Sequence, residues 1–238
     1  MKCLIVAAGQ GVRLREKGDL KPLVPIKGMS IIEHVIKRVQ SAGIDEFVVV
    51  GGYRSDDLGR ELDLISERHG LRIAFIVNVD WSRANGVSLL TAKPHLDEPF
   101  LLTMCDHLID PEIYRSLISA TFDPDTVTLG VDYDLDNPLS DPDDVTRVRC
   151  SNGRIEQIGK SLGDFNAIDT GTFLCTPVIF DALEESQAQG DDSISGAMNV
   201  LARWNKARVL DIQGRLWVDV DDPVAFGKAE QLLESGRL

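Results

Sequence analysis

The chain has 238 residues, with 38 acidic against 25 basic side chains and a net charge of −13. Binding to phosphate backbones needs clustered cations, so this balance excludes broad affinity for nucleic acid or anionic membranes. Hydrophobic residues at 43% and charged residues at 26% are typical of a globular protein that buries its own core without disulfide or metal staples.

In the first half of the chain, short apolar, β-branched runs alternate with segments of helical period. Strands are predicted over 2–7, 46–50, 71–77, 100–104 and 126–131, and helices over 30–42, 56–69, 87–92 and 111–120. The alternation predicts an α/β, Rossmann-like fold with a doubly wound, mostly parallel sheet. Ser30 is expected to cap its helix and Gly43 to end it.

The second half changes character and predicts a mixed extension of that sheet. Residues 145–150 and 154–158 flank Ser151-Asn152-Gly153, a hairpin signal. Further strands are predicted over 170–175, 208–212 and 216–220, and helices over 177–187, 194–205 and 223–234. The acidic stretch 132–144 is typical of a surface loop, with a mobile lid as the alternative. The absence of a linker or repeat favours a single domain over 1–238.

Four cysteines and an ordinary N-terminus bear on the compartment. No two cysteines form a Cys-x-x-Cys pair, and three lie in strand-like runs, so buried free thiols are expected rather than a zinc site. The sequence shows neither a signal peptide nor an apolar run of about 20 residues. We therefore expect a cytoplasmic protein.

The segment 7–22, AAGQGVRLREKGDLKP, follows directly on the first predicted strand. Gly9 and Gly11 allow close approach of a ligand and let backbone N–H groups point at phosphate oxygens. Arg13 and Lys21 add two cations to an otherwise acidic protein. For the glycines alone, an ordinary strand–helix loop is an equally good interpretation.

Two better-known phosphate-binding motifs do not fit this segment. A dinucleotide fingerprint requires Gly or Ala where Leu14 stands and a helix that opens at once, whereas 16–19 extends a loop. The string G-x-x-x-x-G-K-[ST] of a P-loop is absent from the chain.

Carboxylates follow two of the predicted strands. Asp106 comes directly after the fourth strand, at the sheet edge where open α/β sheets bind ligands. Its alternative role as a helix cap suits Asp110 better, since Asp110 precedes Pro111. Asp219 and Asp221 lie two apart on a strand and so face one side, where a cation would relieve their repulsion. Mg²⁺ prefers such oxygen ligands.

The segment 7–28 resembles the nucleotidyltransferase superfamily that activates sugar phosphates and related phosphates with nucleoside triphosphates. The resemblance implies a nucleotide-diphospho-sugar transferase-like fold and a metal-dependent enzyme. In that family the glycine loop and its Arg hold the triphosphate, and the Lys of Lys-Pro contacts the reacting phosphates. These roles fall on Gly9, Gly11, Arg13 and Lys21, of which Arg13 and Lys21 are the implied catalytic pair. Val12 departs from the family pattern, which carries Ser or Thr there.

The resemblance also implies a Mg²⁺ site and a base site. One Asp after the fourth strand and one or two acids after a late Trp hold the metal in that family, which matches Asp106 and Asp221, with Asp219 as a possible third. Cytidylyltransferases carry an Asn-x-x-Ser element against the base, which favours cytosine recognition here; a simple Asn-Gly turn is the alternative. The implied nucleotide-binding residues are Ala7, Ala8, Gly9, Gly11, Asn85, Gly86 and Ser88.

On the acceptor side, the family places a lysine and a polar segment around the phosphate-bearing alcohol. These features match Lys160, Asp169, Thr170 and Gly171, although a lysine at a hairpin end is often merely solvated. The whole pattern is most similar to the inositol-1-phosphate cytidylyltransferases, whose substrates are CTP and a phosphorylated polyol. The alternatives are a hexose-1-phosphate or phosphocholine nucleotidylyltransferase, or a catalytically silent nucleotide-sensing subunit. Some members of the family are fused to a membrane-bound transferase domain.

Overall fold

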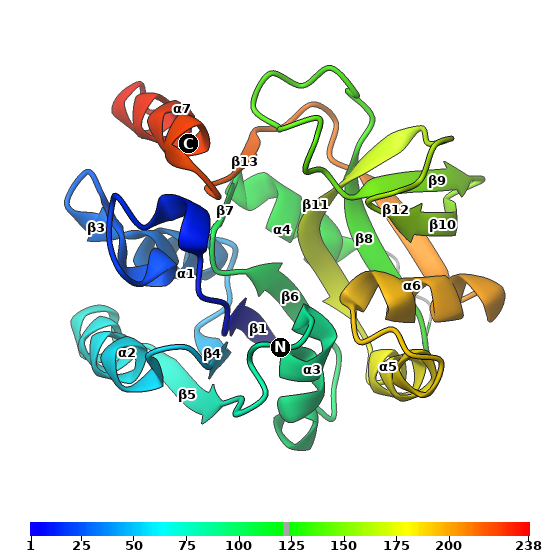
Figure 1. Ribbon diagram of the computed structural model, residues 1–238, viewed down its shortest axis with the longest axis horizontal. Helices are drawn as coiled ribbons and strands as arrows, with labels where there is room; N and C mark the ends of the chain where they lie inside the picture. Colours follow the sequence, from blue (N-terminus) through cyan, green and yellow to red (C-terminus); the bar gives the residue numbers. More distant parts are fainter. Residues whose placement is uncertain (121–123) are drawn as a thin grey trace.

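The computed structural model describes residues 1–120 and 124–238. Within these residues a nine-stranded mixed sheet runs in the order β5-β4-β1-β6-β11-β8-β12-β10-β9 (Figure 1). Its strands are β1 (Lys2–Ala7), β4 (Glu46–Gly51), β5 (Arg72–Val77), β6 (Phe100–Met104), β8 (Val127–Asp132), β9 (Arg147–Ser151), β10 (Arg154–Gly159), β11 (Ala167–Cys175) and β12 (Ala207–Asp211).

The N-terminal part of the sheet is parallel, as the βαβ alternation predicts. β1 pairs in parallel with β4 and β6, and β4 pairs in parallel with β5. The antiparallel pairings are made by the later strands, with β11 between β6 and β8, and with the β9–β10 hairpin. The predicted doubly wound, mixed α/β sheet is therefore confirmed.

Helices cover both faces of the sheet because alternate side chains of the inner strands point to opposite sides. In β1, Cys3 and Ile5 belong to the core beneath α1, α2, α4 and α7, whereas Leu4 and Val6 belong to the core beneath α3, α5 and α6 (Figure 1). The helices are α1 (Ile31–Ser41), α2 (Ser55–His69), α3 (Asn85–Thr91), α4 (Pro111–Ser119), α5 (Val178–Ala188), α6 (Ile194–Arg203) and α7 (Pro223–Glu234), with short 3₁₀ turns η1 (Val12–Leu14), η2 (Lys21–Leu23) and η3 (Lys93–His95).

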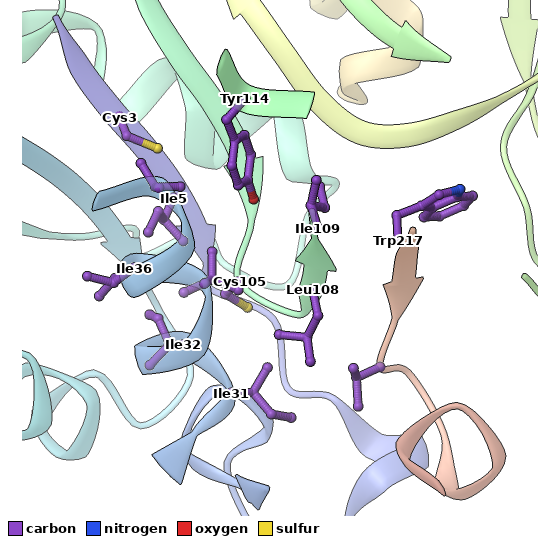
Figure 2. Close-up of a cluster of buried hydrophobic side chains, with 14 of the residues drawn as sticks. Cys3, Ile5, Ile31, Ile32, Ile36, Cys105, Leu108, Ile109, Tyr114 and Trp217 are labelled. Atoms are coloured by element: carbon purple, nitrogen blue, oxygen red, sulfur yellow. The ribbon is translucent and has the colours of Figure 1, made fainter. Parts of the chain in front are cut away.

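Beside this sheet lies a short ladder that the sequence only half predicts. β13 (Trp217–Asp219) falls within the expected strand, but its partner β7 (His107–Ile109) was not expected. In the antiparallel register Asp219 stands opposite His107 and Trp217 opposite Ile109. Figure 2 shows Leu108 and Ile109 of β7 packed in the core between α1 and Trp217. The ladder therefore brings the segment after β6 and the segment before α7 together. A second short pair joins β2 (Pro25–Ile26) and β3 (Met29–Ser30).

Several of the predicted local signals are confirmed. The side chain of Asp110 accepts a cap hydrogen bond at the start of α4, as expected, and those of Ser193 and Asp222 do the same at the starts of α6 and α7. Asn152 and Gly153 both have positive φ at the β9–β10 turn, as a type I′ hairpin requires. The four cysteines are buried and free. No helix of the described part has both the length and the apolar character needed to cross a membrane.

The expected cap at Ser30 is wrong in its chemistry. Ser30 does precede α1, but its side chain makes no cap hydrogen bond. Its buried hydroxyl has no partner among the described residues, because β3 pairs with β2 directly before the helix and turns Ser30 inward. Ser30 thus occupies the N-cap position of α1, but its hydroxyl does not accept a hydrogen bond from the first turn of the helix.

The buried carboxylate of Glu33 ties α1 to α2. Glu33 is 4% exposed and accepts hydrogen bonds from Arg68 at 2.6 Å and His69 at 2.7 Å. Burial opposes ionisation, but these two partners outweigh it and hold the pKa of Glu33 below its usual value.

We expect Glu33→Gln to lower the free energy of unfolding by about 1–3 kcal/mol, measured by urea denaturation at pH 7. A carboxylate whose pKa is lowered by folding stabilises the fold when the pH is above the ordinary pKa of Glu, and this stabilisation is lost as the pH falls. The difference in free energy of unfolding between Glu33→Gln and wild type should therefore shrink below pH ~4. An undiminished difference at pH 3.5 would contradict this origin.

Candidate active site

A cavity of about 750 Å³ opens at the carboxyl ends of β1 and β6. Its wall includes the glycine loop after β1, the segment after β6, the acidic loop of residues 133–146 between β8 and β9, strand β11, and the starts of α6 and α7. Most of the residues expected from the sequence line it: Ala7, Ala8, Gly9, Gly11, Arg13, Lys21, Asn85, Asp106, Lys160, Asp169, Gly171, Asp219 and Asp221. Three expected residues lie behind the wall rather than on it: Gly86, Ser88 and Thr170.

Gly11 determines how the glycine loop meets Lys21. It adopts a left-handed conformation with φ of 60°, and a Cβ at this position would overlap the side chain of Lys21. Gly9 differs, because a Cβ there would meet no atom within 4 Å. The loop therefore needs glycine at position 11 for packing, whereas Gly9 leaves open space beside the cavity.

We expect Gly11→Ala to destabilise the fold by about 1–2 kcal/mol from backbone strain alone and to lower turnover by displacing Lys21. Gly9→Ala is the matched control, since it should leave thermal stability unchanged. Melting temperatures and turnover of both variants test this difference. Equal stability of the two variants would show that the loop adapts without cost.

Lys21 is almost fully buried and surrounded by carboxylates. Its Nζ contacts Asp106 and Asp221 and lies 4.0 Å from Asp219. Burial would lower the pKa of Lys21, but Asp106 and Asp219 outweigh this effect and raise it above its usual value. Lys21 is therefore a fixed positive charge. The same pairing, together with His107, holds the pKa of Asp106 below its usual range despite burial.

Two carboxylate oxygens beside Lys21 are left without a hydrogen bond. Among the described residues, Oδ1 of Asp106 and Oδ1 of Asp219 are buried and unpartnered. Asp106, His107 and Asp219 each offer a ligand atom within 4.8 Å of the other two. Buried polar atoms are normally satisfied, so paired orphan carboxylate oxygens fit a divalent cation such as Mg²⁺. In Asp221, in contrast, both oxygens are already in contact, Oδ1 with Lys21 and Oδ2 with Arg13.

His107 is part of this cluster, and the sequence reasoning gave it no role. Its Nδ1–H donates to the carbonyl of Thr170 at 2.8 Å, and Nε2 lies 3.4 Å from Asp219 and 3.6 Å from Asp106. Burial would lower the pKa of His107, but these carboxylates raise it to about 9. Gly171, with φ of 73°, makes room for the ring, because a Cβ there would overlap it. The sequence signal that could have identified His107 is its position directly after Asp106, just beyond the end of β6.

Residues around the expected base site act mainly as structural supports. Oδ1 of Asn85 accepts from the backbone N–H of Ile194 at 3.0 Å, which joins the starts of α3 and α6. The hydroxyl of Ser88 is buried and accepts from Nδ2 of Asn78 at 3.0 Å. Gly86 lies close against the backbone of Asp192. Only Asn85 of this group reaches the cavity, so contacts of Ser88 and Gly86 with a base stay predictions.

Of the expected acceptor-side residues, Lys160, Asp169 and Gly171 line the cavity. Asp169 accepts from the backbone N–H of Gly171 at 2.7 Å, and burial raises its pKa to about 6. The hydroxyl of Thr170 donates to the carbonyl of Gly130 at 2.8 Å and so secures β11 to β8. Lys160 projects from the end of β10 and contacts Asp144 of the acidic loop. Asp144 also contacts Arg13, and the sequence gave no indication of either pairing.

A glycine loop with two cations, set against partly buried carboxylates at the edge of a mixed α/β sheet, is typical of a nucleotidyltransferase-type site. The sequence profile of the MobA-like NTP transferase domain matches residues 3–194, and the chain belongs to this family. Among solved structures, the inositol-1-phosphate CTP transferase from T. maritima superimposes with a TM-score of 0.87 at 26% identity, covering 98% of this chain and 94% of that one.

Curated relatives include the bifunctional IPC transferase and DIPP synthase of Rubrobacter xylanophilus, 32% identical over 96% of this chain. The chain spans about half, 51%, of that protein's length. A UTP–glucose-1-phosphate uridylyltransferase of Haloferax volcanii is 28% identical, covering 98% of this chain and 97% of that protein. The fold and family are thus those that the sequence predicts.

Proposed function

We propose that this chain transfers CMP from CTP to inositol 1-phosphate and releases CDP-inositol and pyrophosphate. The observation that carries the proposal is the position of Lys21, which lies between the glycine loop and the carboxylates of Asp106, Asp219 and Asp221. The likeness to an inositol-1-phosphate CTP transferase over 98% of the chain supports the choice of substrates.

On the nucleotide side, the backbone of the glycine loop and Arg13 bind the triphosphate, and Lys21 neutralises charge on the reacting phosphates. Asp106 and Asp219 would hold Mg²⁺ through their unpartnered oxygens, with Asp221 orienting Lys21 and Arg13. When bound, the metal supplies Lewis-acid neutralisation of the phosphate oxygens. The family resemblance implied Asp221 as the second metal ligand and Asp219 as a third, and this proposal gives the place of second ligand to Asp219.

On the acceptor side, Lys160 and the Asp169–Gly171 segment bind the phosphorylated alcohol. A phosphate monoester has a second pKa of about 6 and is largely a dianion at neutral pH. Its oxygen attacks the α-phosphorus of CTP, a new P–O bond forms, and the α–β bridging bond breaks with its electron pair leaving on pyrophosphate. No general base is needed, so His107 orients carboxylates and takes no proton from the nucleophile.

A second candidate is uridylyl transfer to glucose 1-phosphate, favoured by the full-length match to the Haloferax volcanii protein. Pyrophosphate release measured with four nucleoside triphosphates against inositol 1-phosphate, glucose 1-phosphate and phosphocholine distinguishes the candidates. Preferred turnover of CTP with inositol 1-phosphate supports the proposal. Preferred turnover of UTP with glucose 1-phosphate would replace it, and no turnover with any pair would indicate a nucleotide-sensing protein.

A further inference from the structure

The acidic loop, residues 133–146 between β8 and β9, places one carboxylate between two cations of the site. Oδ2 of Asp144 lies 2.7 Å from Nη2 of Arg13, and Oδ1 contacts Nζ of Lys160. Burial opposes ionisation of Asp144, but Lys160 and Arg13 hold its pKa below the usual value. A single carboxylate thus bridges the cation proposed for the triphosphate and the cation proposed for the acceptor phosphate.

The loop that carries Asp144 is docked on the protein body. At its base, Asp132 accepts from the indole N–H of Trp217 and from the side chain of Asn137, both at 2.8 Å. Leu139 and Val145 pack against the core beneath α1. Close to the start of β9, the backbone N–H of Asp144 donates to the carbonyl of Asp141 at 3.0 Å. Rotation of the Asp144 side chain therefore releases Lys160 and leaves Arg13 in contact with Asp221 alone among the described carboxylates, without opening of the loop.

A phosphate and the Asp144 carboxylate compete for the same donors. Phosphate offers a guanidinium more acceptor oxygens and a larger charge than a carboxylate does. A carboxylate that stayed in place beside two bound phosphates would repel both of them. Ligands can reach the site of this exchange, because the three side chains are partly exposed: Arg13 by 48%, Asp144 by 26% and Lys160 by 63%.

We propose that Asp144 is a positioning residue that couples the two substrate subsites: it holds Arg13 and Lys160 in place, and the first phosphate to displace it releases the cation for the second. This inference rests on the proposed roles of Arg13 and Lys160, but not on the identity of the base or the alcohol. The first ligand bears the cost of displacing Asp144 and the second does not, which is positive coupling between sites.

The coupling can be measured with a pair of ligands that do not react with each other. Pyrophosphate with Mg²⁺ occupies the triphosphate subsite, and inositol 1-phosphate or inorganic phosphate occupies the acceptor subsite. In wild type, calorimetric titration should show each ligand tightening the other by about fivefold. In Asp144→Asn each ligand alone should bind about fivefold more tightly than to wild type, and the coupling factor should fall toward one.

Asp143→Asn is the matched control, because Asp143 is an exposed neighbour that makes no ion pair within the described chain. It removes the same charge from the same loop and should leave both affinities and the coupling unchanged. If Asp144 merely anchored the loop, its substitution would weaken both ligands and lower the melting temperature, and the inference would be overturned. Unchanged coupling in Asp144→Asn would overturn it as well.

Failure of the proposed function gives a different pattern. The enzyme could prefer another nucleotide and acceptor while Asp144→Asn still abolishes the coupling of pyrophosphate and inorganic phosphate. That result would replace the proposed substrates and support the role of Asp144. The enzyme could instead turn over CTP with inositol 1-phosphate while Asp144→Asn leaves the pyrophosphate affinity unaltered. That result would support the proposed substrates and overturn the role of Asp144.

Discussion

Asp106→Asn is expected to lower turnover by on the order of 10³-fold, roughly 4 kcal/mol of transition-state stabilisation. The substitution keeps the shape of the side chain but removes the charge of a partly buried carboxylate whose buried Oδ1 makes no hydrogen bond within the described chain. The variant should also need a higher Mg²⁺ concentration for half-maximal rate. Steady-state turnover measured across a Mg²⁺ titration gives both quantities.

Asp110→Asn provides the matched control for this experiment. Asp110 lies at the far end of β7 and caps α4 through its side-chain oxygen, a role that Asn fills equally well. Its turnover and Mg²⁺ dependence should equal those of wild type. Survival of Asp106→Asn within about tenfold, worth ~1.4 kcal/mol, would show that Asp106 does not hold the metal.

The parts of this site that lie on strong local patterns could be predicted from the sequence. β1 and β6 are continuous apolar runs, so their ends, and with them Gly9 and Asp106, could be placed at one sheet edge. Gly11, Arg13 and Lys21 follow within a few residues of β1. The prediction succeeds here because side chains that follow neighbouring parallel strands must meet at the same edge.

The parts that could not be predicted depend on long-range pairing. β7 has three residues, too few to show a period, and its partner strand lies about a hundred residues further along the chain. Asp144 meets Arg13 across 131 positions, from a stretch whose composition indicates only a loop. Which carboxylates already have partners is likewise a property of packing. The preference for Asp221 over Asp219 as a metal ligand came from the family resemblance, and it stays a prediction.

Lys21→Met is expected to affect stability and activity in separable ways. Lys21 is 6% exposed and is the buried cation among the carboxylates of Asp106, Asp219 and Asp221. Removing it leaves those charges uncompensated, which should cost about 3–5 kcal/mol and lower the melting temperature by about 10 °C. Turnover should fall at least about a hundredfold, because a donor aimed at the reacting phosphates is lost.

Mg²⁺ distinguishes the two effects of this substitution. A divalent cation can replace the lost charge between the carboxylates, so saturating Mg²⁺ should raise the melting temperature of Lys21→Met more than that of wild type. It cannot replace the lysine as a phosphate ligand, so turnover should stay low. Lys37→Met, the same change at an exposed position of α1, should behave as wild type in both measurements. A Mg²⁺-induced stabilisation no larger in Lys21→Met than in wild type would show that the carboxylates around Lys21 do not form the cation site, whatever the effect on turnover.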